Sequence, residues 1–315
     1  MTLTINNKLV VLMCMFATTN CALFCRAQGA SKEASKPPGA TYANEESGAV
    51  TPQLAAREAA LRSELVMQPD SSGLLYSLAR LLREEGKAHE SLDMYTQAAS
   101  HRKPTAMDLQ SVALDYVMLN DYDDAVRWLE LAAQMEPSNA EVLYSLGRCY
   151  YSKDRFADAG RMFEKVLTIQ PAHLKAEENL GLVYDAANRP EMAEQAFRKA
   201  ASWANENGKD EWPFLDLGSF LLDQDRPKDA VDPLRTSTRI QPKCAACHEK
   251  LGRALLAIGN SAEGVAELQS ATELDPKNPK THYELGRALR QAGQAERARA
   301  EFSLSQKLYS EHSSE

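Results

Sequence analysis

Small and hydrophobic residues recur along most of this chain at a nearly constant interval. One small residue is repeated at spacings of 34, 34, 34, 37, 34 and 34 positions. The positions are Ala79, Ala113, Gly147, Gly181, Gly218, Gly252 and Gly286. An aliphatic residue always precedes the small one, and a leucine or tyrosine follows it three positions later. Columns with this spacing share one face of an α-helix, so each repeat is predicted to begin with a helix that buries that face.

A second helix is predicted in the latter half of each repeat. Twelve positions after the first small residue there is usually another, such as Ala125 or Ala159, and four positions later a large one, such as Leu129 or Phe163. Several of these segments are followed by a proline, which cannot continue a helix. The prolines are Pro137, Pro171, Pro242 and Pro276. One helix pair cannot bury its apolar face alone, so the predicted stable unit is the stack of repeats.

This pattern resembles the tetratricopeptide repeat family. The clearest copy reads Leu143-x-x-Leu146-Gly147-x-x-Tyr150, then Ala159-x-x-x-Phe163 and Pro171. Six other copies are similar, and together they cover residues 72–310. The resemblance implies an all-α fold, a right-handed superhelical solenoid of about seven helix–turn–helix repeats.

The repeat boundaries follow from the columns. They are 72–105, 106–139, 140–173, 174–210, 211–244, 245–278 and 279–310. Glu177 replaces the apolar residue that opens the fourth repeat, and Lys103 and Asn205 replace terminal prolines. Three additional residues fall between Trp203 and Trp212, where we expect a longer turn or a kink.

The segment before the repeats has three predicted parts. Residues 1–27 are predicted to be a secretory signal peptide, because Lys8 precedes a short apolar run and a small-residue site ends at Ala27. We therefore expect a periplasmic or secreted protein; an uncleaved signal, which would associate it with a membrane, is the alternative. Residues 28–51, rich in small, charged and proline residues, are predicted to be a disordered linker. Residues 52–71 are predicted to form a helix that caps the stack.

The charge and the motifs restrict the function classes. The chain has 36 basic and 44 acidic residues, a net charge of -8, which argues against nucleic-acid binding. No Gly-x-Ser-x-Gly elbow and no phosphate-binding glycine loop occurs in the sequence. His248-Glu249 is followed by Gly252 where a zinc-protease helix needs its second histidine. We expect a binding protein, not an enzyme.

The family resemblance implies a concave groove lined by the first helix of each repeat. The residues expected to face this groove stand three positions before and one position after the small residue. Neighbouring positions extend the same face of the helix. The candidates are Tyr76, Arg80, Tyr144, Arg148, Tyr151, Arg253, Tyr283, Arg287 and Arg290. Tyrosine and arginine dominate the binding energy of many interfaces. The alternative is that the recurring Tyr-x-Leu-Gly-Arg is only duplicated repeat sequence, with arginines that are solvated or paired with glutamate.

One motif suggests chemistry of another kind. Cys244-x-x-Cys247-His248 has the spacing of a c-type haem attachment site. Against this, His248 shares its repeat column with His282, which has no cysteines before it, and no methionine follows Met192 as an axial ligand. The other interpretation is a local disulfide, or two free thiols, at the start of a helix. A zinc site at these residues lacks an obvious fourth ligand.

The sequence therefore favours an exported scaffold or adaptor that holds a protein or peptide in its groove and needs no cofactor. Two alternatives stay open at this point. One is an electron-transfer protein with covalent haem at the Cys244–His248 segment. The other is an accessory subunit of an envelope assembly or secretion complex.

Overall fold

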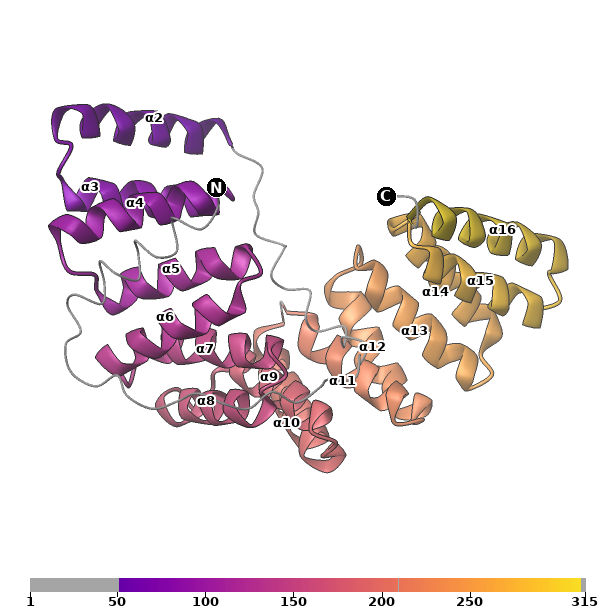
Figure 1. Ribbon diagram of the computed structural model, residues 1–315. Helices are drawn as coiled ribbons and strands as arrows, with labels where there is room; N and C mark the ends of the chain where they lie inside the picture. The colour runs from indigo at the N-terminus through magenta and orange to yellow at the C-terminus, as the bar shows by residue number, and fades with distance from the viewer. Residues whose placement is uncertain (1–50, 209, 313–315) are drawn as a thin grey trace, which may run out of the picture. The chain divides into compact units, whose positions relative to one another are not determined.

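The described part of the chain, residues 51–208 and 210–312 of the computed structural model, contains fifteen helices and no strand (Figure 1). The first is α2 (Pro52–Met67), and the others form seven consecutive antiparallel pairs. The pairs are α3 (Ser72–Glu84) and α4 (Ala88–His101), α5 (Ala106–Met118) and α6 (Tyr122–Met135), α7 (Ala140–Ser152) and α8 (Phe156–Ile169), α9 (Leu174–Ala186) and α10 (Pro190–Asn207), α11 (Trp212–Asp223) and α12 (Pro227–Ile240), α13 (Ala245–Ala257) and α14 (Ser261–Leu274), and α15 (Pro279–Gln291) and α16 (Ala295–His312). The chain divides into two compact units, one up to Pro171 and one from Ala172.

Each pair turns at one residue in the left-handed region. These residues are Gly86, Asn120, Asp154, Asn188, Asp225, Gly259 and Gly293, with φ between 54° and 85°. The amide of the following residue then bonds back to the first helix, as Lys87 N–H does to Leu82 O at 2.8 Å. This bond satisfies a carbonyl at the helix end, as in a Schellman motif. The turn residue always stands seven positions after the small residue, so the repeat includes its own turn.

Helix α2 lies against the first unit with no fully buried residue. Thr51 caps this helix by accepting the Leu54 amide at 3.3 Å. Glu58 lies 2.8 Å from Lys87, and Arg62 lies 2.9 Å from Glu90. The hydrogen bond from Lys87 lowers the pKa of Glu58 to about 2. Helix α2 thus contacts the unit through these ion pairs and through the partly buried Leu54, Leu61 and Leu65.

A buried carboxyl group lies in the core between α4 and α5. Ser91 Oγ is 2.8 Å from Ala79 O and 2.6 Å from Asp115 Oδ2. The serine has one proton to donate, so both contacts are hydrogen bonds only when Asp115 is protonated and donates to Ser91. Burial raises the pKa of Asp115 to about 7, consistent with this arrangement.

In the second unit, the three additional residues lengthen a helix. Helix α10 has 18 residues, whereas α12 and α14 have 14 each. Ala201, near the end of the first 14 residues, and Ala204, the first residue of the extension, are both buried in the core of the unit. Gly208 ends the helix in a left-handed conformation, with φ 61°. The expectation of a longer turn is therefore wrong, because a buried alanine face continues the helix. The alternative of a kink in the superhelix stays a prediction.

Residues 1–50, with the predicted signal peptide and most of the predicted linker, lie outside the described residues. Within the described ranges, no helix combines the length and the apolar character needed to cross a bilayer.

Candidate functional site

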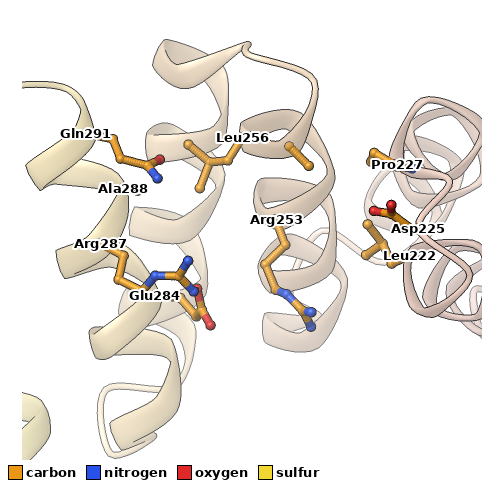
Figure 2. Close-up of a pocket in the computed structure, with 10 residues that line it drawn as sticks. Leu222, Asp225, Pro227, Arg253, Leu256, Glu284, Arg287, Ala288 and Gln291 are labelled. Carbon is orange, nitrogen blue, oxygen red and sulfur yellow. The ribbon is translucent and has the colours of Figure 1, made fainter.

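A cavity of about 270 Å³ lies in the second unit beside the C-terminal halves of α11, α13 and α15, the first helices of three consecutive repeats (Figure 2). Its lining residues are Leu222, Asp225, Pro227, Arg253, Leu256, Ala257, Glu284, Arg287, Ala288 and Gln291. Two of them, Arg253 and Arg287, are groove residues that the sequence predicted. The structure therefore places both arginines at one hollow, on adjacent first helices. We call this hollow the Arg253 cavity.

The two arginines differ in their partners. Arg287 Nη1 lies 3.2 Å from Glu284 Oε2, three positions earlier on α15, and Figure 2 shows the two groups against each other. The position equivalent to Glu284 on α13 is Lys250, a cation. Consistent with that, Arg253 makes neither an ion pair nor a hydrogen bond with any side chain of the described residues. The cavity thus contains one guanidinium whose donors are free.

Charges of both signs surround Arg253. Lys250 lies one turn earlier on α13, and its pKa is lowered, first by burial and then by the charge of Arg253. Glu249, which precedes Lys250, is paired with Lys280 at 3.1 Å instead. Asp223 and Glu249 act on Lys250 in the opposite direction, and Asp225 and Glu284 line the cavity. Because none of these carboxylates pairs with Arg253, its guanidinium keeps donors for an anionic ligand.

Apolar groups complete the wall of the cavity. Leu222 and Pro227 come from α11 and α12, and Leu256 and Ala288 come from α13 and α15. Figure 2 shows Leu256 and Leu222 on either side of the Arg253 helix. The site therefore offers a charged anchor with apolar contacts around it, the usual composition of a pocket for a peptide side chain or terminus.

Other groove candidates in this unit lie outside the cavity lining. The Tyr283 ring is 49% exposed and packs at 5.6 Å from the ring of Phe302. Arg290 lies over the same Phe302 ring at 5.6 Å. Both are accessible, and the structure brings them together on Phe302 of α16.

In the first unit, Tyr144 and Arg148 remain partly exposed and adjacent. The Arg148 guanidinium lies 6.0 Å from the centre of the Tyr144 ring, which packs on Phe163 at 5.9 Å. Arg80 is also partly exposed, but it lies 3.6 Å from Asp108 of the next repeat.

Two predicted groove residues are buried, so their assignment to the groove surface is wrong. Tyr76 is 1% exposed: its hydroxyl donates to Arg102 O at 3.0 Å, and the Arg102 guanidinium covers its ring at 4.2 Å. Tyr151 is 8% exposed and packs edge-on against Phe156 at 5.5 Å. Contacts from the segment after the second helix, or from the turn before it, cover these rings.

The three residues of the haem alternative are all engaged elsewhere. Cys244 and Cys247 form a disulfide with each other. His248 Nδ1 lies 2.6 Å from Glu267 Oε2, and Nε2 lies 3.1 Å from Pro242 O. His282 makes the same two contacts, with Glu301 at 2.7 Å and Pro276 O at 3.1 Å. In this structure both sulfurs are joined in the disulfide and both ring nitrogens of His248 have partners, and the histidine contacts are a property of the repeat. Among the described residues, no cluster of three metal-ligating side chains occurs.

Sequence reasoning missed three residues that decide the electrostatics of the cavity. Lys250 and Glu284 stand two positions before the small residue, in a column that carries serine at 77, 111 and 145. Asp225, the left-handed turn residue after α11, adds a carboxylate to the lining. The change from serine to charged residues in one column is a signal that could have identified the first two.

Comparison with known proteins identifies the repeats. A model of the tetratricopeptide repeat matches residues 113–173 and 249–312, and a second model of the same repeat matches residues 178–207. No protein of curated function matches the sequence.

Several solved structures are similar in fold. Yeast Tom70 has a TM-score of 0.60 at 18% identity, over 81% of this chain and 55% of that one. A tetratricopeptide repeat protein from Parabacteroides merdae ATCC 43184 has a TM-score of 0.59 at 18% identity, over 80% of this chain and 92% of that one. PilW, a type IV pilus biogenesis factor, has a TM-score of 0.56 at 19% identity, over 62% of this chain and 90% of that one.

At these identities the similarity concerns the fold alone. It confirms the fold class that the sequence predicted, an all-helical array of about seven paired-helix repeats. Residues 113–173, 178–207 and 249–312 are tetratricopeptide repeats, and the chain that contains them has the fold of that repeat family.

Proposed function

We propose that this protein is an exported binding scaffold whose Arg253 cavity holds a carboxylate-bearing segment of a partner protein. The observation that carries the proposal is the unpaired guanidinium of Arg253 in a hollow that it shares with Arg287. A scaffold role is typical of tetratricopeptide repeats. The binding of a carboxylate is inferred from the unpaired guanidinium of Arg253.

The size of the cavity restricts the form of the ligand. At about 270 Å³ it is slightly below the usual range of ligand pockets, so we infer that it holds one or two side chains or a chain terminus. The carboxylate would accept two parallel hydrogen bonds from Arg253, the geometry that guanidinium groups provide. Leu222 and Leu256 would contact an apolar group next to it. The ligand is therefore an extended segment with an acidic residue, or a free C-terminus, beside a hydrophobic residue.

A displayed library of random short peptides, probed with the whole purified chain, tests this. We expect enrichment of peptides with an acidic residue or a free terminal carboxylate beside an apolar one. Arg253→Ala should weaken the enriched peptides about 10- to 100-fold, since a charge-assisted hydrogen bond contributes roughly 1.5–3 kcal/mol. Arg287→Ala should weaken them less, because Arg287 already has a partner in Glu284.

Arg299→Ala is the matched control. Arg299 lies on α16, is 75% exposed and pairs with Glu296 on its own helix, so its loss removes one positive charge away from the cavity. If Arg253→Ala and Arg299→Ala weaken peptide binding equally, the effect comes from the net charge of the protein, and the proposed site is contradicted. Enrichment of basic peptides would contradict the ligand class.

The export part of the proposal depends on residues 1–27, which lie outside the described residues. Mass spectrometry of the protein from a secreting host should show a chain that begins at Gln28, after cleavage at Ala27. A chain that retains Lys8 and fractionates with membranes would instead support the uncleaved anchor. Co-purification with a membrane complex in stoichiometric amount would support the accessory-subunit alternative over a soluble adaptor.

A further inference from the structure

A disulfide lies at the N-terminus of α13, well separated along that helix from the Arg253 cavity. Cys244 is the N-cap residue, and its sulfur accepts the Cys247 amide at 3.1 Å. In two other repeats this position is occupied by asparagine: Asn139 and Asn278 accept amides of α7 and α15 in the same way. Cys244 therefore performs the capping role of the repeat while its sulfur is bonded to Cys247.

The two sulfurs differ in accessibility. Cys244 is partly exposed, whereas Cys247 is fully buried, and the Ser237 hydroxyl donates to its sulfur at 3.0 Å. A reagent in solution can reach only Cys244. The sulfur of Cys247 has a hydroxyl donor positioned to stabilise negative charge on it.

The fold does not depend on this bond. The cysteines are three positions apart, so the disulfide closes a very short loop and restricts the unfolded chain little. Helices α7 and α15 begin at the same repeat position with an asparagine cap and no disulfide. After reduction, the Cys244 thiolate would still accept the Cys247 amide, so the helix would remain capped in both redox states.

From this asymmetry we propose that Cys244–Cys247 is a thiol–disulfide exchange site, with Cys244 as the sulfur that forms a mixed disulfide with a partner thiol. The partner class is a dithiol, either a small molecule or a protein with two nearby cysteines. This proposal does not depend on the proposed binding function.

The exchange is a balanced two-electron reaction. A thiolate of the partner attacks Cys244 Sγ: a partner–Cys244 sulfur bond forms, the bond to Cys247 breaks, and Cys247 takes the electron pair and then a proton from water. The second thiolate of the partner attacks its own sulfur in the mixed disulfide and releases Cys244 as a thiolate, held by the Cys247 amide. The partner dithiol has lost two electrons, and two protons to the solvent. The Cys244–Cys247 pair has gained the two electrons and, at Cys247, one proton; Cys244 takes the second proton when its thiolate is protonated. An oxidised partner drives the reverse reaction.

Two single-cysteine variants of the whole chain test the asymmetry. Cys247→Ala leaves the exposed sulfur, and Cys244→Ala leaves the buried one. Treated with oxidised glutathione in native buffer, Cys247→Ala should form a mixed disulfide at least about 100-fold faster than Cys244→Ala, because a buried thiol reacts only through local opening. Cys149, which is buried and whose pKa burial raises to about 12, is an internal control that should remain unmodified.

Peptide mass spectrometry assigns each modified residue, so Cys14, Cys21 and Cys25 do not enter the comparison. A second measurement uses the unaltered chain: dithiothreitol should reduce Cys244–Cys247 in native buffer, and the far-ultraviolet circular dichroism should not change. Arg253→Ala should exchange at the normal rate even if it abolishes peptide binding. Similar rates for the two variants would overturn the proposal, and so would reduction only at denaturant concentrations that unfold the protein. Should a variant fail to fold, the measurement on the unaltered chain decides alone.

Discussion

The close contact of paired helices at the small column can be tested at Gly181. A Cβ atom added there would lie 2.7 Å from Phe197 Cε1 and 2.8 Å from Cδ1. Carbon atoms pack at about 3.5–4.0 Å, so the ring must retreat by about 0.7 Å or more. Phe197 is 1% exposed and packs on Phe220 at 5.4 Å, so it has little room to move. Overpacking of this kind costs roughly 1–3 kcal/mol, whereas alanine gains about 1 kcal/mol over glycine within a helix.

Gly73→Ala is the matched control, since a Cβ at Gly73 of α3 meets nothing within 4 Å. We expect Gly73→Ala to raise the free energy of unfolding slightly and Gly181→Ala to lower it, a difference of roughly 1–3 kcal/mol. The assay is urea unfolding followed by circular dichroism, compared through the transition midpoints because repeat arrays need not unfold in two states.

A second substitution separates steric overlap from other effects. In the second repeat, Ala113 and Leu129 occupy the columns of Gly181 and Phe197. Phe197→Leu should therefore cost less in the Gly181→Ala background than in the unaltered protein, giving a favourable coupling energy in a double-mutant cycle. If Gly181→Ala stabilises as much as Gly73→Ala, or if the two substitutions at 181 and 197 are additive, the proposed close contact is refuted.

Two further predictions concern buried groups. The pKa of Asp115 is about 7 in the folded protein, whereas its ordinary value is 3.8. Between about pH 4 and 7 the folded protein therefore holds a proton on Asp115 that the unfolded chain has released. The free energy of unfolding should fall across this range as the pH rises, by up to roughly 4 kcal/mol. Asp115→Asn should flatten that part of the pH profile, measured by urea unfolding at several pH values; an unchanged slope would contradict a buried protonated Asp115. For the Cys244–His248 segment, we expect a pyridine-haemochrome test on protein from a host that attaches c-type haem to be negative, and a covalent haem signal lost in Cys247→Ala would restore the electron-transfer alternative.

Sequence periodicity was sufficient for the helix pairs because the contacts that define them are local. Gly181 and Phe197 lie on two helices joined by a short connecting turn, and both positions recur in every repeat together with that turn. The turn residues complete the pattern: Asn120 and Asp225 occupy the same position as Gly86, and all adopt the left-handed conformation that Gly, Asn and Asp tolerate best. The extension of α10 was not predictable from the spacing, since an insertion lengthens a helix or a turn according to the residues that it packs against.

The candidate site was less predictable, because exposure and pairing depend on what neighbouring repeats contribute. Tyr76, Tyr144 and Tyr283 occupy one column, yet they are buried, partly exposed and half exposed. Arg102, from the segment after α4, covers Tyr76. Tyr283 lies on α15, and among the described residues no further repeat follows that could cover it.

The ion pairing of equivalent arginines also depends on their neighbours. Arg253 and Arg287 are equivalent in sequence, but the helix position that gives Arg287 its carboxylate, Glu284, gives Arg253 a lysine. A repeat column therefore predicts the face on which a side chain lies, whereas its ion pairs depend on residues outside the column. Arg287 pairs with a residue one turn earlier, and Arg80 pairs with Asp108 of the next repeat. Because Lys250 cannot satisfy Arg253, this guanidinium has donors that a ligand can bind without first breaking an ion pair. That difference distinguishes it from Arg80 and Arg287, which already have carboxylate partners. Arg148, the fourth arginine of this column, also has no carboxylate partner among the described residues and lies 6.0 Å from the centre of the Tyr144 ring. Of these two unpaired arginines, Arg253 is the one that lines a cavity, where its charge favours an external carboxylate.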